Sequence, residues 1–294
     1  MVAEQDELAA HAARLVALLA FPRAVREYTV GLARFRESPR LANKLISYDT
    51  RWRVVGYLLY LAADREWFGA DGGATYGRLL EICTRRQEVS PRVLKTMLAL
   101  LKFTGFIETV HSETDRRSKF YRPTARMDQF VNLWLSYAVS ALDILEPEMQ
   151  RTRMLWEDPG FPDRFLVSGG RDHLANTPPA DRMPEFMALY GARDGAGAAV
   201  LSVMLADIDG TPMPSRAAIA KRFGLSKTQV SNVLAIGEAG GFFTLDDAGV
   251  PAATQYLRDS YRRWISIELA FYARHMQPAR SLNLATGRRA FTDL

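Results

Sequence analysis

The chain has 294 residues, a formal net charge of +5 and a hydrophobic content of 48%. This length and composition predict a soluble globular protein of about two domains, and the modest positive charge is compatible with nucleic-acid binding. The single cysteine, Cys83, excludes an internal disulfide and a cysteine-cluster metal site. We therefore expect a buried thiol in a reducing compartment.

The first 48 residues are expected to form a helical brace, a packing element without a site of its own. An alanine-rich amphipathic helix is predicted over 6–20 and a second helix over 23–36. The chain does not open with the basic region of a signal peptide, and its most apolar run, 130–145, is too short to span a bilayer. We expect a cytoplasmic protein that makes no membrane contact, with the N-terminal helices available for a homodimer.

A helix-turn-helix pattern follows the N-terminal helices. Asp49 and Thr50 can cap a helix over 52–63, and Thr75 can cap another over 76–86. Ser90 can cap a third helix that runs to residue 103, the expected recognition helix of this segment. Its outward side chains are basic or hydroxyl-bearing: Arg92, Lys95, Thr96 and Lys102.

After Gly105 the helical period gives way to alternation, which predicts a strand over 106–111, a polar turn over 112–117 and a return strand over 119–124. The turn and return strand have the sequence Asp115-Arg116-Arg117-Ser118-Lys119-Phe120-Tyr121-Arg122-Pro123-Thr124. In these features the chain from Trp52 to Ala125 resembles the MarR family of winged-helix regulators. The resemblance implies that the Ser90 helix enters the major groove of DNA and that the region of Arg117 reaches the backbone or the minor groove.

The segment that follows is predicted to hold a long helix and a linker. The helix is expected over 126–156 with a break near Pro147, and its apolar stripe indicates core packing. Prolines and glycines are frequent over 157–184, so this stretch is predicted to be a linker with at most one short helix.

A second helix-turn-helix is predicted over 215–245 and repeats the first. Setting Ser90 against Ser226 aligns SPRVLKTMLALLKFTGFI with SKTQVSNVLAIGEAGGFF. Ile219, Ala220, Val230, Val233 and Leu234 are expected to face inward, with Gly224 in the turn. The outward set is Lys227, Thr228, Gln229, Ser231 and Asn232, whose side chains suit contacts with base edges. Two copies indicate a duplicated domain rather than a solenoid.

The second copy is expected to lack most of its wing. Few residues separate Phe243 from Gly249, and they include the acidic Asp246 and Asp247. A long last helix is predicted over 253–276.

The expected fold is therefore mainly α with small β-hairpin wings, as tandem winged helix-turn-helix domains joined by long helices into a pseudo-dimer. The MarR family ordinarily has one such domain per chain. The domain boundaries are an N-terminal helical brace at 1–48, the first winged helix at 49–156, a linker at 157–184, the second winged helix at 185–276 and a tail at 277–294.

Motifs for catalysis or cofactor binding are missing from the sequence. The histidines at 11, 111, 173 and 275 are scattered, and no zinc-protease, nucleophile-elbow or phosphate-loop motif occurs. Residues 195–197 contain only two of the three glycines of a dinucleotide fingerprint and are predicted to form a loop. We expect no enzyme activity, no cofactor and no metal.

The distribution of charge favours double-stranded DNA as the partner. Residues 51–122 contain thirteen Lys or Arg against eight Asp or Glu, whereas residues 195–275 contain eight against seven. The leading hypothesis is a transcriptional regulator, with a plasmid-type replication initiator and a winged-helix protein-interaction module as alternatives. The expected DNA contacts are Arg92, Lys95, Thr96, Lys102, Arg116, Arg117, Lys119, Lys227, Thr228, Gln229, Ser231 and Asn232.

Overall fold

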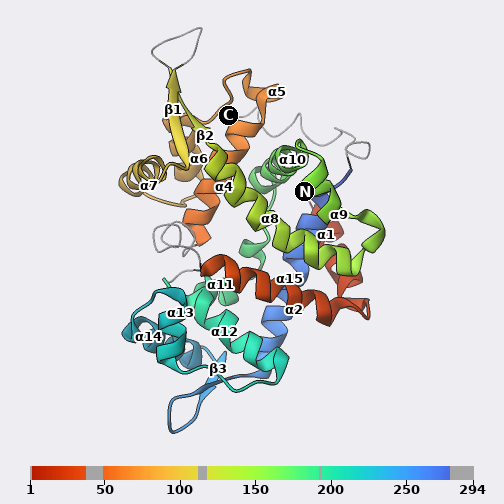
Figure 1. The fold of residues 1–294 in the computed structure, drawn as a ribbon, viewed down its shortest axis with the longest axis vertical. Helices are drawn as coiled ribbons and strands as arrows, with labels where there is room; N and C mark the ends of the chain where they lie inside the picture. The colour runs from red at the N-terminus through yellow and green to blue at the C-terminus, as the bar shows by residue number, and fades with distance from the viewer. Residues whose placement is uncertain (1, 38–48, 112–117, 192–193, 279–294) are drawn as a thin grey trace. The chain divides into compact units, whose positions relative to one another are not determined.

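A computed structural model describes residues 2–37, 49–111, 118–191 and 194–278. The described chain is mainly helical and contains two small antiparallel sheets, each of two strands (Figure 1). The expectation of a mainly α protein with small hairpins is confirmed. Each hairpin directly follows a pair of helices in the chain and precedes a helix of 21 residues.

The N-terminal helices are α1 (Val2–Ala17) and α2 (Phe21–Arg36). Pro22 does not precede α2 but lies in its first turn, where the missing N–H costs no helical hydrogen bond. The side of α2 that holds Phe21, Tyr28 and Thr29 is almost completely buried. Its apolar face is therefore already used for packing inside the chain.

The segment predicted as the first helix-turn-helix comprises α4 (Asp49–Ala63), the short α5 (Arg65–Phe68), α6 (Tyr76–Arg85) and α7 (Pro91–Phe103). Strands β1 (Ile107–His111) and β2 (Lys119–Pro123) form the hairpin, and α8 (Ala125–Leu145) follows. Thr75 and Ser90 cap α6 and α7 through their hydroxyl oxygens, as predicted. Cys83 is buried on α6, and burial raises the pKa of its thiol to about 11.

The expected linker over 157–184 is largely helical, and this prediction was wrong. After η1 (Pro147–Met149) and α9 (Arg151–Glu157), helix α10 (Phe161–Ala175) extends for 15 residues. Helices η2 (Ala180–Arg182) and α11 (Pro184–Tyr190) then lead to the second segment. Arg171 of α10 donates two hydrogen bonds, of 2.7 and 2.8 Å, to the buried carboxylate of Asp64, so α10 is a packed part of the fold.

Apart from the short α5, the second segment has the same order of elements. It comprises α12 (Ala196–Asp209), α13 (Arg216–Phe223), α14 (Lys227–Ala239), β3 (Phe243–Leu245), β4 (Pro251–Ala253) and α15 (Gln255–His275). The predicted loop at 195–197 is instead the start of α12. The second wing is short but formed, with Phe243 paired to Ala253, Thr244 to Ala252 and Leu245 to Pro251.

The described chain packs into two compact units that do not follow the linear order of the expected domains. One unit contains Met1–Asp49, Tyr137–Gln150 and Thr177–Tyr272, and thus the N-terminal helices and the second helix-turn-helix. The other contains Thr50–Ser136, Arg151–Asn176 and Ala273–Leu294, and thus the first helix-turn-helix and α10.

Each unit has an aromatic core of its own. In the unit with the first helix-turn-helix, Trp52 packs edge-on against Phe130 and Trp134 of α8. In the other unit, Phe186 and Tyr190 of α11 pack against Trp264 of α15, with ring centroids 5.5 and 4.5 Å away. Phe186, Tyr190 and Trp264 are buried, whereas Trp52, Phe130 and Trp134 are half-buried, and the apolar area that both clusters remove from water stabilises the packing of their helices.

Candidate nucleic-acid interface

The turn between α6 and α7 contains one residue in the left-handed backbone conformation, and this residue sets the direction in which α7 begins. Gln87 has a positive φ of 54°, and the Glu88 N–H donates to the Cys83 carbonyl at 3.0 Å. Gly224 takes the corresponding place in the second segment with φ 68°, followed by a 2.9 Å bond from the Leu225 N–H to the Ala220 carbonyl. The two segments thus reverse direction by the same left-handed turn, although only one of them uses glycine.

Glu88 anchors the first turn to α4. Its carboxylate is 4% exposed, accepts a 2.7 Å hydrogen bond from the Tyr57 hydroxyl and lies 3.5 Å from Arg53 Nη1 and 3.7 Å from Arg86 Nε. Burial, reinforced by the Glu88 charge, raises the pKa of Tyr57 well above its ordinary value, so its hydroxyl remains a donor. A buried carboxylate with these partners fixes the turn that precedes α7.

The outward face of α7 carries the predicted basic residues. Arg92, Lys95, Thr96 and Lys102 are all exposed. Two of them have local contacts: the Lys95 ammonium lies 5.6 Å from the centre of the Tyr76 ring, and the Thr96 hydroxyl donates to the Arg92 carbonyl at 3.0 Å. Leu94, Met97 and Leu98 are buried on the other side, so the division of α7 into two faces is as predicted.

The first hairpin, the predicted first wing, brings further basic residues to this segment. Strands β1 and β2 pair from Ile107 with Pro123 to His111 with Lys119, and Lys119 is exposed. Arg122 is also exposed and pairs directly with Glu108, an opposite charge that offsets part of its field. The predicted contacts Arg116 and Arg117 lie outside the described residues.

Helix α14, the predicted second recognition helix, begins with a capping box. The Ser226 hydroxyl accepts from the Gln229 N–H at 3.1 Å, and the Gln229 side-chain oxygen accepts from the Ser226 N–H at 2.8 Å. Ile219, Ala220, Val230, Val233 and Leu234 are buried as predicted. Both helices of this motif are therefore held by local capping and by a shared apolar face.

The polar residues of α14 are not equally available to a ligand. Lys227, Thr228 and Asn232 are exposed. The Gln229 amide serves the capping box and also donates to Asp194 at 3.3 Å, while the Ser231 hydroxyl accepts from Arg216 Nη1 at 3.4 Å. In the described conformation, Gln229 and Ser231 act as structural partners rather than as free side chains, which their sequence positions did not indicate.

The second wing is closed by its own acidic residue. The Asp246 carboxylate accepts a 2.8 Å hydrogen bond from the Val250 N–H, and the Gly249 N–H donates to the Asp246 carbonyl at 2.7 Å. Arg216, at the start of α13, donates from Nε and Nη2 to the Gly249 carbonyl at 3.2 and 3.0 Å. Asp246 is therefore a turn-forming residue, whereas Asp247 is simply exposed.

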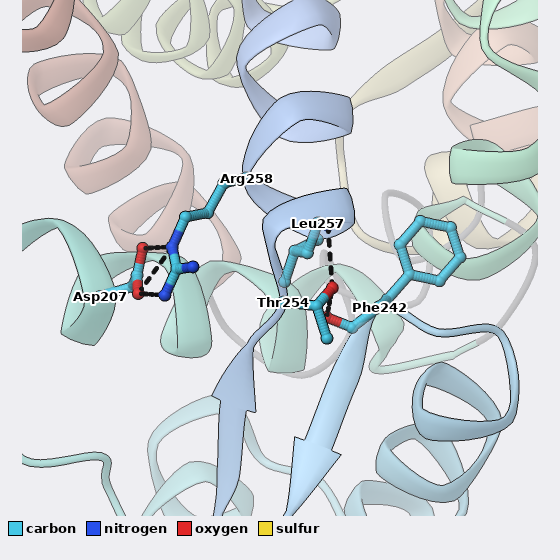
Figure 2. Close-up of polar contacts among 5 residues, drawn as sticks. All are labelled: Asp207, Phe242, Thr254, Leu257 and Arg258. Atoms are coloured by element: carbon cyan, nitrogen blue, oxygen red, sulfur yellow. Dashed lines mark hydrogen bonds and ion pairs between the residues drawn. The ribbon is translucent and has the colours of Figure 1, made fainter.

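The junction between wing and long helix is built alike in both segments. Figure 2 shows Thr254 at the start of α15, where its hydroxyl lies 3.0 Å from the Phe242 carbonyl and accepts from the Leu257 N–H at 3.1 Å. In the first segment, the Thr124 hydroxyl lies 2.6 Å from the Gly105 carbonyl and 3.1 Å from that of Phe106. The same carbonyl positions are thus bound by a threonine that follows each hairpin.

A bidentate ion pair supports the second junction. Arg258, one turn into α15, donates from Nη2 and Nε to the Asp207 carboxylate of α12 at 2.6 and 2.9 Å (Figure 2). Such a fork fixes the helix that leaves the wing relative to the first helix of the segment.

The structure also brings together three residues that the sequence left apart. The Ser168 hydroxyl lies 2.8 Å from His275 Nδ1, and His275 Nε2 lies 2.8 Å from Asp172 Oδ2. Ser168 and Asp172 are one turn apart on α10, a weak signal, and nothing in the sequence connects them with His275.

This array has the composition of a hydrolase triad but not its setting. The His275 side chain is 6% exposed, and Ser168 lies inside α10, where the backbone N–H groups that could bind an oxyanion serve the helix. Arg151 Nε donates to the neighbouring Met276 carbonyl at 3.0 Å. We interpret the array as an anchor for residues 273–276 rather than as a catalytic centre.

Two further surveys bear on other classes of site. The described residues contain no group of three or more His, Cys, Asp or Glu able to hold a metal ion. Within the same residues no single helix is long and apolar enough to cross a membrane; Glu7–Ala17 with Phe21–Arg36 meets the length and composition criteria only as a pair bent by 106°.

The geometry therefore supplies two exposed polar helix faces, each followed by a hairpin. Comparison of the chain with protein-family models, curated proteins and solved structures finds no match.

Proposed function

We propose that the chain is a cytoplasmic, sequence-specific regulator of transcription that binds double-stranded DNA through two winged helix-turn-helix domains. The observation that carries the proposal is the repetition, within one chain, of two capped helices, a left-handed turn, a hairpin and a threonine-anchored helix of 21 residues. This order of elements suits a recognition helix for the major groove and a wing for the flanking backbone.

The exposed chemistry supports DNA rather than a neutral ligand. Arg92 and Lys102 extend from α7 and Lys119 from β2, all exposed and in one unit. Cations at these positions can neutralise phosphates, which supplies most of the sequence-independent affinity of a DNA-binding protein. The exposed Asn232 of α14 can bind an adenine edge with two hydrogen bonds.

The resemblance of the first segment to MarR regulators supports the same proposal. On this resemblance, the β1–β2 hairpin corresponds to the wing of that family and α7 to its recognition helix. The second segment extends the resemblance by the shared Thr254 junction and by the Gly224 turn. On this proposal the two segments are unequal copies of one winged-helix domain.

The proposal is tested by selecting duplexes from a random pool and mapping the bound sites in a genome by chromatin immunoprecipitation. Binding to promoters at scattered positions supports regulation of transcription. Binding to reiterated sites beside an origin would support a replication initiator instead. Absence of salt-dependent affinity for any duplex would overturn both.

One observation favours the alternative of a protein-interaction module. Phe103, at the end of α7 beside Lys102, is 82% exposed, and exposed aromatic side chains are typical of protein interfaces. The variant Phe103→Ala separates the two functions. Unchanged DNA affinity together with loss of a co-purifying protein partner would assign this end of α7 to protein binding.

A further inference from the structure

Arg216 occupies an unusual place for a basic residue in a helix-turn-helix. It is the first residue of α13, yet its guanidinium contacts both other elements of the motif. Nε and Nη2 donate to the Gly249 carbonyl in the turn between β3 and β4, at 3.2 and 3.0 Å, and Nη1 donates to the Ser231 hydroxyl on α14 at 3.4 Å. One side chain therefore connects the second wing with the recognition helix.

The wing turn is shaped around this guanidinium. Gly249 has φ +70°, and a Cβ atom added to it would lie 1.5 Å from Arg216 Nη2. Every other residue type has a Cβ atom that would fill this space. Glycine at this position therefore allows both the left-handed backbone conformation and the close approach of the Arg216 guanidinium. The turn and Arg216 form one packed arrangement.

The first segment connects the same kinds of element by different chemistry. Tyr76, the first residue of α6, lies under the Lys95 ammonium, and Lys95 aligns with Ser231 when Ser90 is set against Ser226. The Tyr121 N–H of β2 donates to the Ala74 carbonyl at 2.8 Å, two residues before Tyr76. In both segments, the start of the first helix contacts the fifth residue of the recognition helix and lies beside the wing.

We propose that Arg216 is a positioning residue that fixes the second wing to α14, and that it does not bind DNA phosphate. This inference rests on the proposed function, since it assigns a role within a DNA-binding motif. Three of the five guanidinium N–H groups donate to protein acceptors on the wing turn and α14, so the side chain is held along the motif by contacts within the protein. Loss of Arg216 makes the second wing more mobile and reduces the sequence preference of the second segment for DNA. The number of phosphate contacts stays constant.

The first arm of the test needs no DNA. Amide hydrogen exchange is measured in the full chain for Arg216→Ala, Arg216→Lys and the control Lys221→Ala, an exposed basic residue on the same helix. We expect exchange at Gly249 and Val250 to rise about tenfold or more in both Arg216 variants, because their turn loses its anchor, and to stay unchanged in Lys221→Ala. Exchange in the interior of α14 should remain as in the wild type, which shows that the motif is folded.

The second arm measures DNA binding by the same variants on selected and random duplexes. We expect Arg216→Ala to keep the wild-type slope of log affinity against log salt while losing preference for the selected site. A slope reduced by roughly 0.9 with unchanged wing exchange would make Arg216 a phosphate contact and overturn the inference. If the wild-type chain binds no duplex, the proposed function fails, and the exchange arm still decides whether Arg216 holds the wing.

The variant Gly249→Ala provides an independent check, because its Cβ would occupy the position of the guanidinium. We expect it to raise wing exchange in the wild-type background and to add less in Arg216→Ala, where the clash is absent. Equal increments in the two backgrounds would show that backbone strain alone, and not Arg216, governs the turn.

Discussion

Asn232 and Gln229 lie less than one turn apart on α14 and have different physical roles. Asn232 is exposed, whereas the Gln229 amide completes the capping box with Ser226. The variant Asn232→Ala should lose about 1–3 kcal/mol of discrimination at one base pair, because a bidentate contact with adenine disappears. Its melting temperature should equal that of the wild type. Selection from a random duplex pool measures the first effect and thermal unfolding the second.

The companion variant Gln229→Ala should mainly reduce the stability of the fold rather than change base preference. Loss of the Gln229 half of the capping box is expected to reduce the free energy of unfolding by about 0.5–1.5 kcal/mol, the net contribution of one hydrogen bond. Gln229→Glu separates the two contacts of this side chain, since a carboxylate can still accept from the Ser226 N–H but cannot donate to Asp194. A Gln229→Ala variant with wild-type stability and altered base preference would return this residue to the set that reads DNA.

Asp172 makes the stability of the chain depend on pH. Burial acts to raise the pKa of its carboxyl, but the hydrogen bond and charge of His275, with the Asn176 amide, outweigh it and lower the pKa below its ordinary value. A depressed folded-state pKa gives stability that is complete above the unfolded value, about 3.9, and is lost as pH falls through the folded value. Asp172→Asn should therefore show a weaker loss of stability between pH 5 and acid than the wild type.

The measurement is denaturant unfolding at a series of pH values. Glu81→Gln, which removes an exposed carboxylate from α6, is the control and should follow the wild-type curve. Parallel curves for wild type and Asp172→Asn would mean that the bond to His275 persists at equal strength when Asp172 is protonated.

At the scale of elements, the two wings differ in charge and in construction. Lys119 is exposed on the first wing with Arg116 and Arg117 in the adjoining turn sequence, while the second wing exposes Asp247. Replacing the three basic residues with alanine should flatten the slope of log affinity against log salt by about two to three units, since each lost phosphate contact removes roughly 0.9. Affinity for specific and random duplexes should fall together.

Two variants serve as controls for the first wing. Arg122→Ala should change the slope less than Lys119→Ala, because Glu108 opposite Arg122 already offsets part of its charge. Asp247→Asn should leave the slope unchanged or steepen it; Asp246 is unsuitable because its carboxylate closes the turn. An unchanged slope for the triple variant would place the first wing away from DNA and favour a role in packing or protein binding.

Local signals predicted most elements because their causes are local. The expected caps Thr75, Ser90 and Ser226 are formed, and the apolar faces of α7 and α14 are buried. A helix cap depends on residues three positions apart and an apolar helix face on one or two turns. Both signals can therefore be recognised from neighbouring residues in one sequence.

Helix α10 was missed because its helix-breaking residues are accommodated by tertiary contacts. Pro162 lies in the first turn, where proline is tolerated. Gly170 lies against Tyr60, and a Cβ at that position would come within 2.5 Å of the ring. Contacts between residues far apart in the sequence also explain why the bonding roles of Gln229, Ser231 and His275 were not predicted. Their partners are Asp194, Arg216 and Asp172.

At the scale of the whole molecule, chain order did not predict how residues group into units. Residues 137–150 were assigned to the first domain, yet they pack with the N-terminal helices and the second segment. Residues 273–276, assigned to the second domain, include His275, which contacts Ser168 of α10, and Met276, whose carbonyl accepts from Arg151 of α9. These pairings are long-range in sequence, and hydrophobic periodicity carries no information about partners at that distance.

The N-terminal helices bear on the stoichiometry of a DNA complex. The face of α2 that the sequence offered for a homodimer packs on α12, and Thr29 shares a 2.8 Å hydrogen bond with Tyr261 of α15. In the turn between α1 and α2, Leu18 and Leu19 remain exposed. Two leucines are a small apolar area for a stable interface. We therefore predict that the chain binds DNA as a monomer and that the homodimer is not required.

Under the proposed function, a monomer with two recognition helices makes a definite prediction about its DNA site. The exposed side chains differ, with Arg92 and Lys102 on α7 and Thr228 and Asn232 on α14, so the two half-sites should differ in sequence and need not form a palindrome. Successive major grooves on one face of a duplex are about 34 Å apart, which sets the expected spacing of the half-sites. Sedimentation of the protein with a defined selected duplex should give one chain per duplex, and Leu18→Ser with Leu19→Ser should leave that ratio unchanged. Two chains per duplex on a palindromic site, reduced to one by the leucine variants, would instead assign the turn between α1 and α2 to a homodimer with four recognition helices.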